Sequence, residues 1–387
     1  MKIIADQNIY QVENAFSDLG TVTAVPSYKI NRAILEDAQA LLVRSVTPVN
    51  RDLLEGMPVK FVASATIGVD HIDLDYLHEN CIGFAHAPGS NADSVAEYVI
   101  AAVFQIISKG VFNLKDLKLG IIGAGNVGSR IARLARALGM ECLLNDPPKR
   151  TLTGNEIYLP LEEVLKQSDI VSLNIPLTMD GQYSTYHMVN ADFVSLMKSG
   201  AALINTSRGK IIDEKSFRTV REHLGILVLD VFENEPSINM ETLRMADIVT
   251  PHIAGYSLDG KLRGTEMIYQ AMNSFFFKEG SWSAESTTLA SQEELIDLRS
   301  SKNPLYDAVL RAYPIMNDDE QFRQIFSVHK DQQARYFEEL RKNYPKRLEF
   351  THYKIILNAS QSVEASILRE LRFQVALTDD NQFQPEM

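Results

Sequence analysis

The sequence predicts an α/β protein with two doubly wound domains, each built on a parallel sheet, followed by a small α+β domain. Short apolar segments alternate with helical periodicity up to about residue 285, and a glycine-rich turn joins one such segment to a helix. Beyond that residue, helical patterns come first and strand-like segments follow. A chain of 387 residues is long enough for two or three domains.

The first predicted domain is discontinuous and combines residues 1–94 with residues 257–284. Its N-terminal part alternates short apolar strands with helices and contains no nucleotide-binding glycine pattern. The strands include residues 2–5, 40–43 and 60–63. The helical pattern at residues 259–277 comes after the second domain, and we expect this helix to return to the first.

The second predicted domain, residues 95–256, carries the most informative segment of the chain. A short apolar strand at residues 117–122 leads directly into Gly123, Gly125 and Gly128, which form G-x-G-x-x-G at the start of a helix. We expect the first glycine to allow a tight turn and the second to let backbone approach a pyrophosphate. The third should let the helix pack closely on the strand. This pattern predicts a Rossmann-type dinucleotide site with the helix amides facing the phosphates.

An acidic residue at the end of the next strand bears on which dinucleotide binds. Residues 141–145 are strand-like and lead to Asp146, whose carboxylate can accept hydrogen bonds from both ribose hydroxyls of the adenosine. A 2′-phosphate would meet Asp146 as a like charge, although Lys149 and Arg150 follow closely. The pattern favours NAD over NADP.

The later elements continue the alternation and then break it. In the second domain we expect a helix at residues 94–107 and strands at 170–175, 201–205, 225–230 and 247–250. In the third domain, residues 285–387, we expect helices at 305–313, 320–326 and 331–344, and strands at 348–357 and 371–377. A small appended module is most often an assembly surface, so we predict a dimerisation domain and a homodimer, with a stabilising extension as the alternative.

Charge and composition limit the classes of partner. A formal net charge of −12, with no run of five basic residues, argues against a nucleic-acid-binding surface. The apolar stretch near residues 96–107 is too short and too mixed to span a membrane. Cys81 and Cys142 lack the spacing of metal or redox pairs, so we expect free thiols, no metal site and a cytoplasmic location.

Three charged side chains follow strand ends in the second domain, at the edge where open α/β sheets bind ligands. Arg208 lies in NTSRG, where its guanidinium can grip a carboxylate and Gly209 allows a ligand to approach closely. Glu235 lies in DVFENEP and His252 in PHIAGY. A histidine beside a carboxylate accepts protons near neutral pH, because the negative charge stabilises the imidazolium and fixes the tautomer.

Taken singly, each of these three residues is more typical of a structural or surface role. Together, and beside a dinucleotide fold, they indicate a catalytic set. The remaining histidines considered have no comparable neighbours in the sequence and are expected to be structural or exposed. They are His71, His78, His86 and His187.

In their order along the chain, GAGNVG, NTSRG, DVFENEP and PHIAGY resemble the D-isomer-specific 2-hydroxyacid dehydrogenases over about residues 1–285. The resemblance implies an NAD-dependent oxidation in which His252 takes the hydroxyl proton, Glu235 supports it and Arg208 binds the substrate carboxylate. Ile175 stands where a threonine is common in the family. Further contacts to the cofactor are expected from Asn126, Val127, Ile175, Thr206, Ser207, Asp230 and Gly255.

Four further segments, MKIIADQNI, LLVRSVTPVN, HIAGYSLDGKLRGT and YPKRLEF, resemble one branch of that family over nearly the whole chain. Members of this branch act on a phosphorylated 2-hydroxy acid and carry a C-terminal dimerisation domain. The resemblance implies substrate contacts from Ser45, Thr66 and Tyr256. Arg44 is a further candidate, because a cation and hydroxyls at a strand end can hold phosphate, although turn formation explains Ser45 about as well. Leu348 replaces an arginine of the branch.

Two other functions remain open from the sequence. The chain can be a dehydrogenase for another 2-hydroxy acid, such as 3-phosphoglycerate or glycerate. It can also be a non-catalytic partner protein that senses NAD(H), because this fold is used in that way by transcriptional co-repressors. The intact set of Arg208, Glu235 and His252 favours catalysis.

Overall fold

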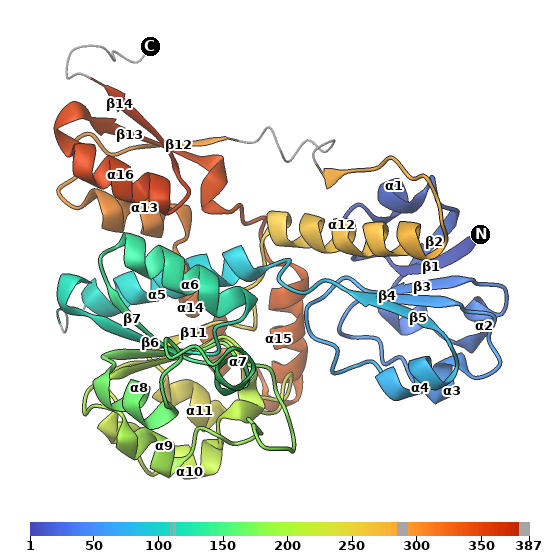
Figure 1. The fold of residues 1–387 in the computed structure, drawn as a ribbon, viewed down its shortest axis with the longest axis horizontal. Coiled ribbons are helices and arrows are strands. Elements are labelled where there is room, and N and C mark those ends of the chain that lie inside the picture. The colour runs from blue at the N-terminus through green and yellow to red at the C-terminus, as the bar shows by residue number, and fades with distance from the viewer. Residues whose placement is uncertain (109, 111–113, 285–292, 379–387) are drawn as a thin grey trace. The chain divides into compact units, whose positions relative to one another are not determined.

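The computed structural model consists of two compact units (Figure 1). Unit 1 comprises residues 1–92 and 257–292, and unit 2 comprises residues 93–256 and 293–387. The structure describes residues 1–108, 110, 114–284 and 293–378. The start of the predicted third domain, residues 285–292, lies outside the described residues, and the assembly role of that domain stays a prediction.

Unit 1 is built on a five-stranded parallel sheet. In sheet order the strands are β2 (Thr21–Val25), β1 (Lys2–Asp6), β3 (Ala40–Val43), β4 (Phe61–Ser64) and β5 (Gly83–His86). The helices are α1 (Val12–Phe16), α2 (Arg32–Leu35), α3 (Arg51–Leu54), α4 (Leu74–Glu79) and α12 (Leu258–Phe275). The strands β3 and β4 are buried along their whole length, as expected for a parallel sheet covered on both faces. Helix α12 packs against β4, β5 and α1, so the segment after residue 257 completes the unit.

The first part of unit 2 is a six-stranded parallel sheet flanked by helices (Figure 1). In sheet order the strands are β11 (Ile248–Val249), β10 (Leu227–Leu229), β9 (Ala202–Asn205), β8 (Ile170–Leu173), β6 (Lys118–Ile122) and β7 (Glu141–Asn145). The helices are α5 (Ala92–Ser108), α6 (Asn126–Ala137), α7 (Pro147–Thr153), α8 (Leu161–Gln167), α9 (Ala191–Leu196), α10 (Glu214–Arg218) and α11 (Met240–Met245). The chain goes from β6 to one neighbour, β7, and then crosses to the other, β8. The strand order therefore reverses at the end of β6, which is where ligands bind in doubly wound folds.

The C-terminal part of unit 2 adds a three-stranded sheet in the order β12, β13, β14, again all parallel. Its elements are β12 (Glu294–Asp297), α13 (Pro304–Ala312), α14 (Ile315–Arg323), α15 (Gln333–Lys342), β13 (Tyr353–Asn358), α16 (Ser362–Glu370) and β14 (Gln374–Thr378). Buried residues of this part, such as Ile296 and Phe350, belong to the same hydrophobic cluster as Val99 and Ile100 of α5. The two parts of unit 2 thus share one core.

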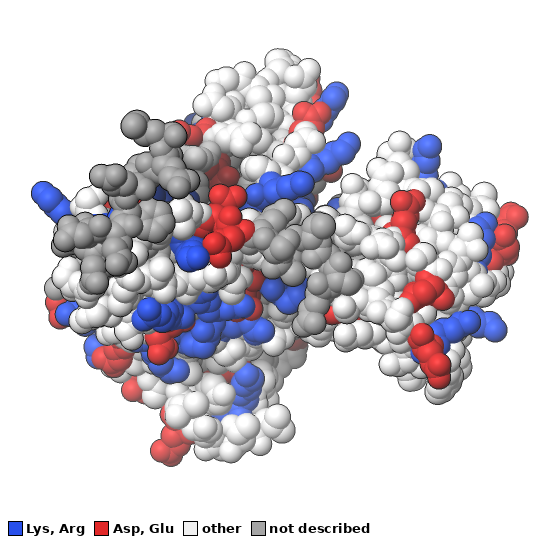
Figure 2. Space-filling model, turned by 90° about the horizontal axis from the view of Figure 1, so that it is seen from above, with Lys and Arg blue, Asp and Glu red and all other residues white. Residues whose placement is uncertain are grey.

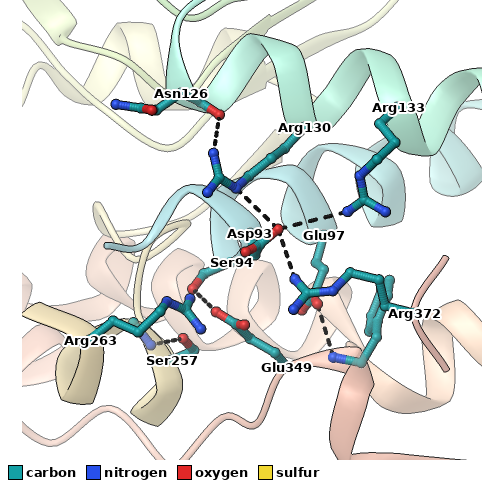
Figure 3. Close-up of polar contacts among 12 residues, drawn as sticks. Asp93, Ser94, Glu97, Asn126, Arg130, Arg133, Ser257, Arg263, Glu349 and Arg372 are labelled. Atoms are coloured by element: carbon teal, nitrogen blue, oxygen red, sulfur yellow. Dashed lines mark hydrogen bonds and ion pairs between the residues drawn. The ribbon is translucent and has the colours of Figure 1, made fainter. Parts of the chain in front are cut away.

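Polar contacts also join the two parts of unit 2. The carboxylate of Asp93 on α5 forms ion pairs with Arg372 at 2.7 Å and with Arg130 of α6 at 3.2 Å (Figure 3). On α14, the Asp319 carboxylate accepts the amide hydrogen of Val249 in β11 at 2.7 Å.

In the C-terminal part, β12 and α16 were not predicted, and two of the predicted elements begin at other residues. The helix predicted at residues 320–326 begins earlier, as α14, because its polar residue Asp319 is buried against β11 and not exposed. The strand predicted at 348–357 begins only at Tyr353. Before that residue, the amide of Phe350 donates to the Glu97 carboxylate at 2.9 Å and not to a neighbouring strand.

The surface carries charges of both signs. On the face drawn in Figure 2, Lys and Arg side chains lie interspersed with Asp and Glu side chains. Within the described ranges, the structure contains no helix with the length and hydropathy needed to cross a membrane.

Candidate active site

The three candidate catalytic residues follow three adjacent strands of unit 2. Arg208 comes after β9, Glu235 after β10 and His252 after β11, and β10 pairs with both of the others. Because the strands are parallel, their carboxyl ends meet at one edge of the sheet. The fold therefore brings together residues that are up to 44 positions apart in the chain (252 − 208).

His252 and Glu235 form a hydrogen-bonded pair, as the sequence predicted. The imidazole Nδ1 lies 2.6 Å from the carboxylate Oε2, and the side chains are 33% and 18% exposed. An ionised carboxylate can only accept, so Nδ1 carries the hydrogen and Nε2 keeps the lone pair. This is the tautomer needed for a base that accepts a proton at Nε2.

The environment of Glu235 keeps its carboxylate ionised. Burial opposes ionisation, but the charge and hydrogen bond of His252 outweigh it, together with the amide of Phe232 and the charge of Arg341. As a result, the pKa of Glu235 lies below its usual value of 4.5. The Phe232 amide donates to Oε1 at 2.8 Å, so each carboxylate oxygen has its own donor.

The loop that carries His252 is held by Asp230 at the end of β10. The carboxylate of Asp230 accepts the amide hydrogens of Ile253 at 2.8 Å and Ala254 at 3.0 Å, and the hydroxyl of Thr250 at 2.7 Å. Burial raises the pKa of Asp230 to about 6, against the opposing effects of His252 and these hydrogen bonds. Asp230 thus organises the loop that carries His252, while its predicted contact with the cofactor stays a prediction.

Arg208 lies in a turn whose glycine has a different role from the expected one. A Cβ at Gly209 would lie 1.8 Å from the backbone carbon of Phe232, so this glycine is required by the neighbouring chain and not by a ligand. The close approach places the turn after β9 against the loop that leads to Glu235. The Nη1 of Arg208 donates to the carbonyl of Ser207 at 2.8 Å.

One of the other histidines has an acidic partner that the sequence did not suggest. His187 Nε2 lies 2.9 Å from the Oε1 of Glu233. The prediction that His187 has no such neighbour is therefore wrong. A backbone bridge between Val189 and Ile212 brings the histidine close to the turn at Gly209, and this turn packs on the loop containing Glu233.

The glycine-rich turn after β6 has the geometry of a dinucleotide site. Gly123 has a φ of +88°, in the left-handed region, as expected for the tight turn. A Cβ at Gly128 would lie 2.0 Å from the carbonyl oxygen of Gly123, so helix α6 packs closely, as predicted. A Cβ at Gly125 would meet nothing within 4 Å, which leaves this position open to a ligand.

Side chains around this turn fit a nucleotide. The Oγ1 of Thr206 is buried and has no hydrogen-bond partner among the residues that the structure describes, so it can serve a bound ligand. The Oδ2 of Asp146 accepts the amide hydrogen of Ala124 at 3.0 Å, which places the acid beside the glycine turn. Lys149 Nζ donates to the carbonyl of Ala124 at 2.6 Å. The amide of Ile175 donates to the hydroxyl of Ser207 at 3.1 Å.

In unit 1, the candidate substrate residues follow β3 and β4. Arg44 is half-buried and Ser45 is exposed, directly after β3. Thr66 follows β4 and shares a 2.7 Å hydrogen bond with Ser64. Sequence reasoning missed Lys261 on α12: burial and the charge of Arg44 lower its pKa, so the two cations lie close enough to repel each other.

Sequence reasoning also missed residues of the C-terminal part that surround Tyr256. The ring of Tyr344 meets the ring of Tyr256 edge to face, with centroids 6.0 Å apart. The guanidinium carbon of Arg341 lies 5.8 Å from the Tyr256 ring centroid. The signal was the segment YPKRLEF and the helix before it; the sequence used this segment only as a mark of resemblance and assigned no site residue to it.

Comparisons with known proteins agree with this geometry. Residues 104–254 match the family model "D-isomer specific 2-hydroxyacid dehydrogenase, NAD binding domain". Residues 291–371 match a domain of unknown function. An erythronate-4-phosphate dehydrogenase of Salinibacter ruber is 40% identical over 368 residues, which cover 92% of this chain and 94% of that protein.

Solved structures show the same fold. A D-lactate dehydrogenase from Aquifex aeolicus, complexed with NAD and lactic acid, has 29% identity and a TM-score of 0.58, covering 72% of this chain and 96% of that one. A 3-phosphoglycerate dehydrogenase from Entamoeba histolytica with bound NAD⁺ has 26% identity and a TM-score of 0.61, covering 74% and 99%.

Proposed function

Because the chain belongs to the D-isomer specific 2-hydroxyacid dehydrogenase family, we propose that it is an NAD-dependent enzyme that oxidises 4-phospho-D-erythronate at C2. The product is 3-hydroxy-2-oxo-4-phosphooxybutanoate, an intermediate of pyridoxine (vitamin B6) biosynthesis. The observation that carries the proposal is the 40% identity to an erythronate-4-phosphate dehydrogenase over 92% of the chain. The bonded pair of His252 and Glu235 supports it, because this oxidation requires a base.

His252 takes the proton of the C2 hydroxyl. Its Nδ1 is occupied by Glu235, so the proton is accepted at Nε2. The imidazole then becomes positive, and the ionised Glu235 stabilises that charge at short range. Proton transfer by a positioned group of this kind contributes about 10²- to 10⁴-fold to the rate.

Arg208 binds the substrate carboxylate and polarises the carbonyl that develops at C2. A guanidinium presents two parallel N–H donors, which match the two oxygens of a carboxylate. Its place after β9, beside the strand that leads to Glu235, supports this role.

Bound NAD supplies the acceptor for the hydride that leaves C2. The turn after β6 binds its pyrophosphate, and Asp146 binds the adenosine ribose. The buried hydroxyl of Thr206 supports this assignment, because it has no other hydrogen-bond partner among the described residues. The residues proposed to hold the cofactor are Gly123, Gly125, Asn126, Val127, Gly128, Asp146, Ile175, Thr206, Ser207, Asp230 and Gly255.

The phosphate of the substrate binds residues of unit 1. Arg44 and Lys261 are two neighbouring cations, and a dianion would relieve their repulsion. Ser45 and Thr66 add hydroxyl donors, and Tyr256 is a further candidate for a contact with the substrate. The protein acts as a cytoplasmic homodimer, with residues 285–387 as the assembly domain.

Activity measured on several 2-hydroxy acids tests the proposal. The purified full-length protein is given NAD and a carbonyl trap, with 4-phospho-D-erythronate, 3-phospho-D-glycerate and D-glycerate in parallel. We expect the highest kcat/KM with the four-carbon phosphate. His252→Asn should lose nearly all turnover and still bind NAD, whereas His187→Asn, a control at another histidine paired with an acid, should remain active.

Other outcomes would overturn parts of the proposal. If the protein prefers 3-phospho-D-glycerate, the proposed substrate is wrong but the proposed reaction at C2 still holds. The similarity to the Entamoeba histolytica enzyme makes 3-phospho-D-glycerate the second candidate substrate. No turnover of any acid, with NAD bound, would favour a sensor that responds to NAD(H).

A further inference from the structure

The catalytic loop of unit 2 is contacted from the C-terminal part of the chain at two points. Arg347 bonds to the backbone of Ala254, two residues after His252. Tyr344 and Arg341 pack on the ring of Tyr256, four residues after it. None of these contacts was among the sequence predictions, which gave the domain an assembly role with a stabilising extension as the alternative.

Arg347 is buried, with 7% of its surface exposed. Its Nη2 donates to two backbone carbonyls, that of Ala254 at 3.0 Å and that of Ser94 at 2.7 Å. The ring of Tyr313 covers the guanidinium, with the centroid 4.2 Å from its central carbon. One nitrogen therefore ties the catalytic loop to the start of α5.

Two buried acids lie within electrostatic range of Arg347. Glu97 and Glu349 are both almost fully buried, and both interact electrostatically with Arg347. Ser94 Oγ donates to Glu349 at 2.8 Å (Figure 3). The amide of Phe350 donates to Glu97 at 2.9 Å. A buried cation with these partners is costly to remove, because the buried acids around it would lose their positive neighbour.

The loop needs such support because its conformation is unfavourable. His252 has a φ of +57°, in the left-handed region that residues with a side chain rarely adopt. On one side, Asp230 holds the loop through the amides of Ile253 and Ala254. On the other side, Arg347 holds the carbonyl of Ala254. Residues 253–254 are thus held through two backbone amides, which donate to Asp230, and through one backbone carbonyl, which accepts from Arg347.

Tyr256 is the second point of contact. Its ring meets Tyr344, whose hydroxyl donates to Asp318 on α14 at 2.8 Å. Asp318 also accepts the hydroxyl hydrogen of Tyr313, the residue that covers Arg347, at 3.1 Å. The two anchors of the loop therefore belong to one polar network in the C-terminal part.

We propose that Arg347 is a positioning residue for the catalytic base: by fixing the carbonyl of Ala254, it keeps the loop in the conformation that pairs His252 with Glu235. Tyr344 is the second anchor of the same loop. The inference rests on the proposed function only in taking His252 as the base, and the paired geometry can be measured without turnover.

Arg347→Lys is the first test. A lysine keeps the buried charge, but its shorter reach and different donor geometry do not reproduce the bonds to both carbonyls. We expect kcat to fall by about 10- to 100-fold, as for a misplaced catalytic group, with KM and NAD affinity close to wild type. The control is Arg323→Lys, because Arg323 is also in the C-terminal part and donates to a carbonyl, that of Ala246, outside the loop. It should keep the kcat of the wild type.

A second readout does not depend on activity. The Nδ1 hydrogen of His252, bonded to Glu235 over 2.6 Å, should give a far-downfield proton resonance in protein labelled with ¹⁵N-histidine. The resonance should broaden or vanish in Arg347→Lys and persist in Arg323→Lys. If Arg347→Lys does not fold, Tyr344→Leu takes its place, with the same expectations.

Different results would overturn the positioning role of Arg347 and the proposed function of the protein. An Arg347→Lys protein with wild-type kcat and an unchanged resonance would overturn the positioning role. A wild-type protein that turns over no 2-hydroxy acid would overturn the proposed function, while the resonance would still decide whether Arg347 fixes the pair.

Discussion

Replacing Glu235 by glutamine should stop His252 from acting as a base and should leave the fold intact. The carboxylate now faces two donors, the Phe232 amide at 2.8 Å and His252 Nδ1 at 2.6 Å. An amide has one acceptor oxygen and one donor NH₂ group, so it can satisfy only one of them. The backbone N–H cannot change, whereas the imidazole can shift its proton. The glutamine should therefore turn its NH₂ group toward His252 and select the tautomer that has hydrogen on Nε2.

The size of the effect follows from this change of tautomer. With hydrogen on Nε2, His252 cannot accept the substrate proton, and the charge that stabilised the imidazolium is also gone. Loss of general-base catalysis costs about 10²-fold or more in kcat, or roughly 2.7 kcal/mol in the activation barrier. The comparable Asp→Asn change in a Ser-His-Asp triad costs about 10⁴-fold. We expect Glu235→Gln to fall between these values.

Steady-state NAD reduction, with NAD affinity measured separately, tests this prediction. Glu233→Gln is the matched control, because it changes the same group in the same loop but pairs with His187. It should keep the kcat of the wild type within about threefold, because its carboxylate contacts His187 and not His252. The reasoning is refuted if Glu235→Gln also stays within that range.

Three further predictions concern the phosphate site, the glycines and a buried acid. Lys261→Met should raise KM for 4-phospho-D-erythronate by about tenfold or more but leave KM for D-glycerate nearly unchanged, since it removes a charged hydrogen bond to phosphate; an equal rise for both acids would contradict a phosphate contact. Gly209→Ala should lower the free energy of unfolding in urea by about 1 to 3 kcal/mol, because its Cβ would meet the Phe232 backbone at 1.8 Å. Gly125→Ala, with open space around it, should leave that free energy unchanged and weaken NAD binding, and the reverse pattern would contradict both assignments. Burial, and then the charge of Glu349, raise the pKa of Glu97 well above its usual 4.5, so the wild type should lose stability as pH rises above that value. Glu97→Gln does not titrate, so its stability relative to the wild type should increase as the pH of the urea unfolding experiment is raised above 4.5, and a constant difference would argue against the raised pKa.

The parts of the fold that the sequence predicted have local causes. The strands β3 and β8 are short apolar runs buried on both faces, and the pattern around Gly123 depends on a left-handed turn at the glycine itself. The three candidate catalytic residues could also be predicted from local sequence patterns. Each follows the end of an apolar strand, and parallel strands place these ends at one edge of the sheet.

The parts that the sequence did not predict depend on contacts between distant residues. The start of β13 is delayed because Phe350 bonds to Glu97, 253 positions away, and α14 extends over Asp319 because that acid bonds to β11. The closeness of Lys261 to Arg44, and of His187 to Glu233, also arises only when segments meet in space. No pattern within one segment contains this information.

The measurement that tests the central claim most directly is the transfer of deuterium from 4-phospho-D-erythronate labelled with deuterium at C2. If hydride leaves C2 while His252 takes the hydroxyl proton, the deuterium will appear in the NADH formed, as mass spectrometry can show, and very little deuterated NADH will form with His252→Asn. NADH formed without deuterium, or a labelled product released with the deuterium still at C2, would contradict oxidation at that carbon.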